Sequence, residues 1–148
     1  MNMHVTGTCH CGAVTFSAEV DEANVIVCHC TDCQVMASSA FRLGALVRRD
    51  TFHISGAVKE YAKVGTSGTR RLQVFCPECG TGIYSYAPDV DSPFISLRLG
   101  GVRERAQLRP VLQIWRQSAL PWVGQLDDIP CSMQQEAITA AIARRPEQ

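Results

Sequence analysis

Clustered cysteines are the feature that most constrains this chain, because seven of its eight cysteines fall into three short motifs. In chain order the motifs are C-x-C, C-x-C-x-x-C and C-x-x-C-G. Their cysteines are Cys9 and Cys11, then Cys28, Cys30 and Cys33, then Cys76 and Cys79. Random placement would rarely give such spacings, so the motifs predict metal binding. Cys131 stands apart from them and is interpreted as a buried thiol, because free cysteine packs like a small apolar residue.

The spacings have a geometric basis. On an extended strand, residues i and i+2 point to the same face, so both sulfurs of a C-x-C motif can approach one ion. The intervening His10 or His29 then points away. In C-x-x-C-G the chain turns between the ligands, and Gly80 can take the left-handed conformation that closes the turn. Thiolates are soft ligands that favour zinc among the common divalent ions, so we expect zinc.

A ligand count indicates two zinc ions per chain, in sites of different kinds. Structural zinc takes four protein ligands, and the first and third motifs together supply Cys9, Cys11, Cys76 and Cys79. The second motif keeps three sulfurs, and three ligands with an open position are typical of catalytic zinc. Spacing alone leaves the partition open, because the first motif could instead pair with the second. A fourth ligand from Asp32 or Cys131 would also close the second site.

Hydrophobic alternation predicts a mainly β chain. In residues 13–20, AVTFSAEV, apolar and polar side chains alternate as in a half-buried strand. Further strands are expected at 25–27, 40–47, 51–54, 58–61, 70–75, 83–86, 95–99 and 111–115, with loops at 63–68 and 86–93. Only the C-terminus is expected to be helical, because Ser132 and Gln135 resemble a capping box before apolar residues at helical spacing. No linker or repeat is visible, which favours one domain.

Composition favours a soluble cytoplasmic protein. Apolar residues make up 46% of the chain and charged residues 19%, and 14 basic residues balance 14 acidic ones. A net charge of zero gives no reason to expect nucleic acid as a partner. The N-terminus lacks the pattern of a signal peptide, and no apolar run is long enough to suggest a membrane partner. In a reducing compartment, eight cysteines are better explained by metal binding or catalysis than by disulfides.

The three motifs, in this order, resemble those of the glutathione-dependent formaldehyde-activating enzyme family, also called the CENP-V/GFA family. The similar segments are GTCHCGAVTF at 7–16, CHCTDCQ at 28–34, FCPECGT at 75–81, and SALPWV with LDDIP between 118 and 130. The resemblance therefore implies one zinc domain over residues 1–148 with a core of about 7–130. The chain departs from the family pattern at Ser38 and Ser39, where many members have a glycine.

The resemblance implies a β-tent (Mss4-like) fold of folded antiparallel sheets with two zinc sites and a short C-terminal helix. It also implies that the four-cysteine site is structural and that Cys28, Cys30 and Cys33 hold the active-site zinc. The family's activity is the condensation of formaldehyde with glutathione, classed as a carbon–sulfur lyase reaction. We therefore expect a lyase whose partner is a small thiol such as glutathione. The alternative is a non-catalytic zinc-binding or interaction module of the same fold.

Other side chains are candidates through their place in the sequence. His29 is expected to be a hydrogen-bonding neighbour of the second site rather than a ligand, and either His29 or Asp32 could transfer protons. Arg70 or Arg71 could contact a carboxylate of glutathione. Both tryptophans are expected in the core, with stacking against a ligand as the alternative.

Overall fold

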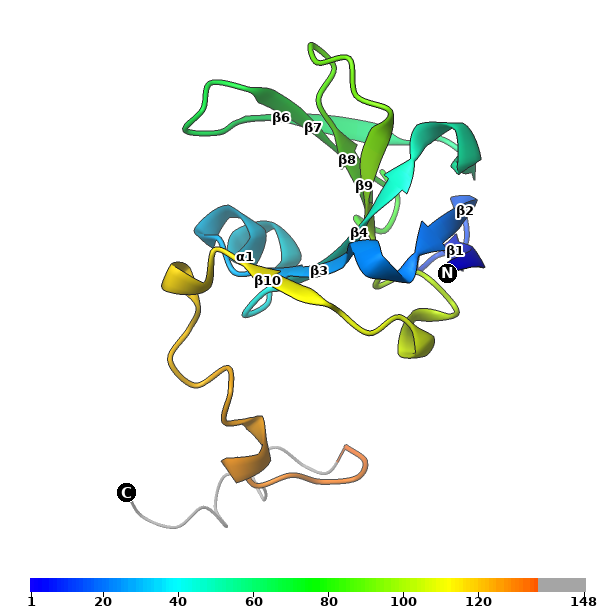
Figure 1. Cartoon of the computed structure of the whole chain (residues 1–148). Coiled ribbons are helices and arrows are strands. Elements are labelled where there is room, and N and C mark those ends of the chain that lie inside the picture. The colour runs from blue at the N-terminus through cyan, green and yellow to red at the C-terminus, as the bar shows by residue number, and fades with distance from the viewer. Residues whose placement is uncertain (136–148) are drawn as a thin grey trace.

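The computed structural model describes residues 1–135, and these form two β-sheets (Figure 1). The smaller sheet has the order β1 (Asn2–Thr8), β2 (Thr15–Asp21) and β5 (His53–Ser55). The larger sheet has the order β10 (Leu112–Ile114), β3 (Val25–Cys28), β4 (Arg42–Arg48), β9 (Phe94–Arg98), β8 (Gly82–Tyr86), β7 (Arg70–Phe75) and β6 (Lys59–Val64). Adjacent strands are antiparallel except β10 and β3, which are parallel. The expectation of a mainly β protein with antiparallel sheets is confirmed.

The predicted strands match the observed ones to within three residues at each end. The strand at 70–75 is reproduced at both ends as β7. In two places the prediction was wrong. It missed β1, and it extended a strand through Thr51, which belongs to the short 3-10 turn η2 (Arg49–Thr51). The other 3-10 turns are η1 (Glu22–Asn24), η3 (Arg105–Gln107), η4 (Arg116–Ser118) and η5 (Leu126–Asp128).

One α-helix, α1 (Thr31–Ala37), occurs among the described residues. The prediction that only the C-terminus is helical is therefore wrong. The predicted C-terminal helix falls mainly on residues 136–148, outside the described part of the chain. The N-cap of α1 is Cys30, whose Sγ accepts a hydrogen bond from the Cys33 N–H at 3.3 Å. The helix ends at Ser38, which has a left-handed φ of 48°. Residues 1–135 contain no helix that is long and apolar enough to cross a membrane.

The core lies between the two sheets and consists of side chains at alternating positions of their strands. In β9, Ile95 and Leu97 are buried against it, while Ser96 and Arg98 project from the other face of the sheet. The remaining core residues of the larger sheet include Val25, Ala45, Val47 and Ile83, and those of the smaller sheet include Val5, Phe16, Ala18 and Val20. The two faces of the larger sheet therefore differ, with one apolar and packed and the other carrying polar side chains.

The larger sheet is strongly bent. Figure 1 shows β6, β7, β8 and β9 rising away from the end of the sheet formed by β3 and β10, with α1 in the angle between the two parts. The side chains that do not face the core therefore point into this angle.

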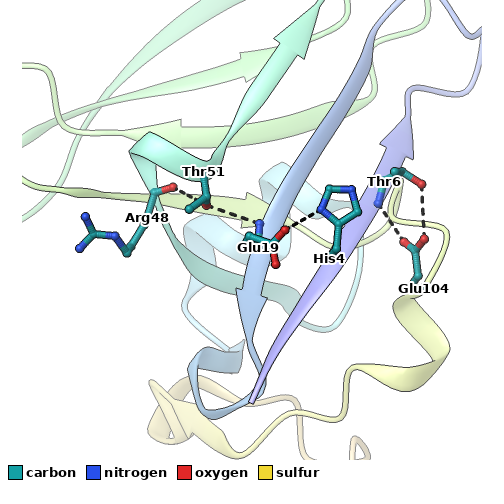
Figure 2. Close-up of polar contacts among 6 residues, drawn as sticks. All are labelled: His4, Thr6, Glu19, Arg48, Thr51 and Glu104. Atoms are coloured by element: carbon teal, nitrogen blue, oxygen red, sulfur yellow. Dashed lines mark hydrogen bonds and ion pairs between the residues drawn. The ribbon is translucent and has the colours of Figure 1, made fainter.

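The open edge of β1 is covered by the segment that follows β9. Thr8 N–H donates to the Gly101 carbonyl at 3.1 Å, and Arg103 N–H donates to the Thr6 carbonyl at 2.9 Å. The Glu104 carboxylate accepts hydrogen bonds from the Thr6 N–H at 3.0 Å and from its hydroxyl at 3.3 Å (Figure 2). The Thr6 N–H also lowers the pKa of Glu104. Unpaired strand edges invite association with other chains, so these contacts close a vulnerable edge.

A second contact in Figure 2 joins the smaller sheet to the end of β4. The Thr51 hydroxyl accepts from the Glu19 N–H at 3.4 Å and donates to the Arg48 carbonyl at 2.9 Å. On the same strand, the Glu19 carboxylate lies 2.6 Å from His4 Nδ1. The Thr51 hydroxyl therefore holds β2 against the segment that follows β4. The contact between His4 and Glu19 joins β1 to β2.

Replacing Glu104 tests the cover on β1. We expect Glu104→Ala to lower the free energy of unfolding by about 1 kcal/mol, because the Thr6 N–H loses its acceptor in a partly buried position. Glu104→Gln keeps an acceptor oxygen and should lose less. Urea denaturation measures both values, and equal stability of Glu104→Ala and the wild type would contradict the assignment.

Candidate metal centre and adjoining cavity

Four cysteine sulfurs from distant parts of the chain meet at one point. The Sγ atoms of Cys9, Cys11, Cys76 and Cys79 all lie within 4.8 Å of one another. The Sγ of Cys11 lies 3.6 Å from that of Cys9 and 3.8 Å from that of Cys76. A tetrahedral ion with metal–sulfur bonds of about 2.3 Å holds its sulfurs about 3.8 Å apart. All four are free thiols, and their spacing fits a four-coordinate metal ion. We call this group the four-sulfur cluster.

Tight backbone turns present these sulfurs. In the first turn, Gly12 N–H donates to the Cys9 carbonyl at 3.2 Å, and Gly12 has a φ of 84°. In the second, Gly80 N–H donates to the Cys76 carbonyl at 2.9 Å, and Gly80 has a φ of 77°. Side chains with a Cβ rarely adopt this conformation. The predicted left-handed Gly80 is confirmed, and Gly12 has the same role in the first motif.

Thr81 supports the four-sulfur cluster through its hydroxyl group. The Thr81 Oγ1 accepts a hydrogen bond from the His10 N–H at 3.1 Å and lies 3.2 Å from Cys79 Sγ. Hydrogen bonds from Thr81 favour the charged sulfur and lower the pKa of Cys79 to about 5. Thr81 therefore favours the thiolate form of Cys79, which is the form that binds metal.

The second motif forms a separate group, the three-sulfur cluster. The Sγ atoms of Cys28, Cys30 and Cys33 lie within 4.8 Å of one another. Cys28 ends β3, Cys30 caps α1, and Cys33 lies in the first turn of that helix. The strand and the helix together therefore bring three sulfurs to one place, and the four-sulfur cluster includes none of them.

In residues 1–135, no fourth side chain completes the three-sulfur cluster. The Asp32 carboxylate instead lies 2.9 Å from Lys63 Nζ. Cys131 is exposed rather than buried, so the interpretation of it as a buried thiol is wrong. Neither alternative ligand joins the three sulfurs, which leaves one side of the cluster open.

The thiols of this cluster affect one another electrostatically. Burial, followed by the interactions with Cys30 and Cys28, raises the pKa of Cys33 to about 12. Three thiolates can therefore coexist here only when a cation compensates their charge. The chemistry of the three-sulfur cluster fits a divalent metal with one coordination position left for another ligand.

A cavity of about 380 Å³ adjoins the three-sulfur cluster. All seven strands of the larger sheet and α1 contribute side chains to it. These are the strand residues that do not face the core, as Ser96 and Arg98 of β9 illustrate. The bend of the sheet therefore gathers polar groups from many strands around the three sulfurs.

Three of the side chains lining this cavity form an arginine cluster, namely Arg42, Arg71 and Arg98. Arg42 Nη1 and Arg98 Nη2 both donate to the Gln73 amide oxygen, at 3.3 and 2.7 Å. Burial, and next the positive charge of Arg42, lower the pKa of Arg98 to about 9. Arg98 also donates to the Ser96 hydroxyl at 2.9 Å, and Arg71 to the Ser85 hydroxyl at 3.2 Å.

The structure separates the candidate proton-transfer residues. His29 is only 1% exposed and its Nε2 lies 2.8 Å from the Gln113 amide oxygen. It lines a different cavity from the one at the three sulfurs. The interpretation of His29 as a hydrogen-bonding neighbour agrees with this position. Asp32 lines the cavity of the three-sulfur cluster and is the better placed of the two.

The paired arginines of β7 are separated in the same way. Arg71 lines the cavity, whereas Arg70 is exposed and its Nε lies 3.1 Å from Asp89 Oδ2.

The tryptophans are not core residues, contrary to expectation, because Trp115 is 52% exposed and Trp122 is 43% exposed. Trp115 lines the cavity.

Sequence reasoning did not single out several polar residues of the cavity, namely Arg42, Lys63, Gln73, Ser85, Ser96 and Arg98. Polar residues that alternate with buried apolar ones are ordinarily interpreted as a solvated sheet face. The signal that was available is three arginines, Arg42, Arg71 and Arg98, at such positions in three predicted strands. Only the bend of the sheet brings them together.

The sequence profile of the family described as glutathione-dependent formaldehyde-activating enzyme, GFA, matches residues 4–118. The chain belongs to this family. The matched region contains both sulfur clusters and every residue that lines the cavity. Among solved structures, the crystal structure of a Rhodobacter sphaeroides protein matches with a TM-score of 0.54 and 23% identity. The match covers 73% of this chain and 98% of that chain, and it shows similarity of fold. No curated protein sequence matches the chain.

The raised pKa of Cys33 gives metal uptake at the three-sulfur cluster a defined pH dependence. Metal binding must displace the Cys33 proton, so affinity should fall as pH is lowered from about 8 to about 6. Titration with zinc against a competing chelator measures this, together with proton release at each pH. Cys30→Ser provides the comparison, because it removes a ligand of this cluster alone. Affinity that does not change with pH would contradict the assignment.

Proposed function

We propose that this chain is a zinc-dependent carbon–sulfur lyase of the GFA type, acting on the adduct of a thiol such as glutathione and an aldehyde such as formaldehyde. Family membership supports the reaction class. The observation that carries the proposal is the three-sulfur cluster, which has an open side next to a cavity of about 380 Å³. A closed structural site would have neither an open position nor a cavity for a substrate.

In this proposal each sulfur cluster holds one zinc ion. The four-sulfur cluster is the structural site, and Cys28, Cys30 and Cys33 are the ligands of the active-site zinc. The fold is the β-tent (Mss4-like) arrangement, and residues 1–135 act as part of one zinc domain. Zinc bound by three thiolates carries a net negative charge, which favours exchange of a thiol ligand over polarisation of a carbonyl group.

When bound, zinc would hold the substrate sulfur as a thiolate at neutral pH. The protein supplies the rest of the reaction from the walls of the cavity. The Asp32 carboxylate, held by Lys63 at 2.9 Å, can accept the proton of the incoming thiol. It can then return that proton to the aldehyde oxygen once the carbon–sulfur bond has formed. The reverse sequence breaks the adduct.

Loss of one cysteine ligand tests the zinc-centred reaction. We expect Cys30→Ser to fold, to hold one zinc instead of two, and to lose thiol-dependent turnover by at least about 100-fold. Elemental analysis and initial rates of adduct formation measure these quantities. Cys131→Ala is the control, because the exposed Cys131 joins neither cluster, and it should keep both zinc ions. Normal turnover in Cys30→Ser would contradict the proposal.

Zinc retention also separates the enzyme from its alternative, a non-catalytic zinc-binding module. The observation that favours this alternative is the exposure of several large apolar side chains in the last described part of the chain, namely Val111, Leu112, Trp122, Leu126 and Ile129. We expect the open site to lose zinc when the protein is dialysed against glutathione, while the closed site keeps it. Two zinc ions that both survive this treatment, without turnover, would favour the interaction module.

A further inference from the structure

The arginine cluster has no acidic partner in the part of the chain that the structure describes. Its hydrogen bonds go to neutral amide and hydroxyl oxygens. Arg42 Nε is buried and has no hydrogen-bond partner among these residues. By contrast, Arg70, the next residue to Arg71, forms an ion pair with Asp89. Gathering like charges in a partly buried place is unfavourable, so this cavity is built to receive an anion.

The arginine cluster adjoins the three sulfurs directly. Arg42 lies opposite Cys28 in the β3–β4 pair, and side chains at opposite positions lie about 5 Å apart at Cβ. Arg98 lies opposite Gly44, two residues further along β4. Glycine has no side chain to separate the neighbouring groups. An anion bound by these arginines is therefore close to whatever occupies the open side of the three-sulfur cluster.

A charge count shows that the arginines do more than neutralise the cysteines. Three thiolates on a divalent ion leave one negative charge, and the Lys63–Asp32 pair adds none. The arginine cluster brings three positive charges to the same cavity, so two remain uncompensated. A substrate thiolate would compensate one of these charges. One carboxylate would compensate the other.

We propose that the arginine cluster binds the carboxylate of the carbonyl substrate, and that the preferred aldehyde is a 2-oxo acid with its carboxylate next to the carbonyl carbon. This inference rests on the proposed thiol–aldehyde function. It changes the aldehyde from a small uncharged molecule to a small anion.

The number of bonds between the carboxylate and the reacting atoms favours the carbonyl substrate, rather than the thiol, as the source of this carboxylate. The carbonyl carbon must touch the substrate sulfur to form the new bond, so a carboxylate attached to that carbon also lies beside the cluster. In glutathione, both carboxylates are separated from the sulfur by a peptide linkage. The position of the sulfur therefore does not by itself place those carboxylates beside Arg42, which lies opposite Cys28.

The reaction needs no additional reactant. The sulfur lone pair forms a bond to the aldehyde carbon of the 2-oxo acid, and the carbonyl π electrons move to its oxygen. That oxygen takes the proton that the thiol released. The product is a 2-hydroxy acid with sulfur on the same carbon, and nothing is oxidised or reduced. The carboxylate stays bound to the arginine cluster throughout.

A matched pair of aldehydes tests the proposal. Glyoxylate and glycolaldehyde have similar size, but only glyoxylate carries a carboxylate. We expect the zinc-loaded wild type to use glyoxylate with a kcat/KM about 10- to 100-fold above that for glycolaldehyde, as one charged hydrogen-bonded contact would give. Arg71→Gln should remove most of this preference, measured as the ratio of kcat/KM for glyoxylate to kcat/KM for glycolaldehyde. Arg70→Gln, on the exposed side of the same strand, is the control and should behave like the wild type.

Binding provides a second measurement that needs no turnover. Calorimetric titration with glycolate, an unreactive carboxylate of similar size, should show binding to the wild type and to Arg70→Gln. Binding should weaken about tenfold or more in Arg71→Gln. Ethylene glycol, which lacks the charge, should not bind measurably. Arg98 is mostly buried, so a variant that removes both its charge and its size could prevent folding. Arg98→Lys keeps the charge, and we expect it to weaken glycolate binding less than Arg71→Gln does.

Three results would overturn the inference, and they differ from one another. Equal use of glyoxylate and glycolaldehyde, with no effect of Arg71→Gln, would remove the anion subsite and leave the proposed function intact. An Arg71→Gln defect that follows the charge of the thiol, seen with glutathione but not with 2-mercaptoethanol, would assign the carboxylate to the thiol. Glycolate binding without turnover of any thiol–aldehyde pair would overturn the proposed function and, with it, our assignment of the carboxylate to an aldehyde.

Discussion

The meeting of four sulfurs from two turns that are far apart in the chain is the constraint on which the rest of the structure depends. Cys9 and Cys11 lie in the turn between the strands of the smaller sheet, and Cys76 and Cys79 lie in the turn between β7 and β8. A metal held there would join the two sheets across the apolar core, and structural zinc contributes roughly 10 kcal/mol or more to small domains. With this junction fixed, one face of the larger sheet is committed to the core, and the other remains free to line a site.

The bend of the larger sheet turns the face that does not pack against the core into the wall of a cavity. An alternating strand places polar residues on one face whatever its surroundings, but a flat sheet would leave Arg42, Arg71 and Arg98 in water. The bend and α1 turn the same residues toward Cys28 and its neighbours. In the proposed function the two clusters therefore have different roles: a metal at the four-sulfur cluster would hold the sheets together, and the three-sulfur cluster would present its open side to the cavity lined by arginines.

Local patterns predicted most of the fold. Alternation identified β7 at both ends and placed most of the other strands, because strand periodicity depends only on nearby residues. The glycine after the third motif predicted its left-handed turn for the same reason. Helix α1 was missed because its seven residues are too few to show a helical period, and its N-cap is a cysteine sulfur rather than one of the usual polar caps. It ends at Ser38 in a left-handed conformation, which glycine adopts more readily than serine.

The candidate site was predictable only where its residues share a motif. The cysteine motifs identified the sulfurs of both clusters, and the ligand count favoured the observed grouping although spacing alone left it open. The arginines, by contrast, come from strands that are far apart in the sequence. No local pattern records that β4, β7 and β9 curve around one point. The prediction for the tryptophans was wrong because size and apolarity predict burial on average, whereas Trp115 is exposed and lines the cavity.

The parallel pairing of β10 with β3 has a consequence for how the site forms. These are the last and first strands of the larger sheet in chain order, yet they are neighbours in it, and Ile114 lies opposite Cys28. The wall of the cavity is therefore incomplete until Ile114 and Trp115 have been synthesised, and contacts between such distant segments form slowly. A nascent chain would carry its reactive sulfurs before it had a pocket to enclose a substrate. The cavity beside the three-sulfur cluster would thus close only after β10 has joined β3.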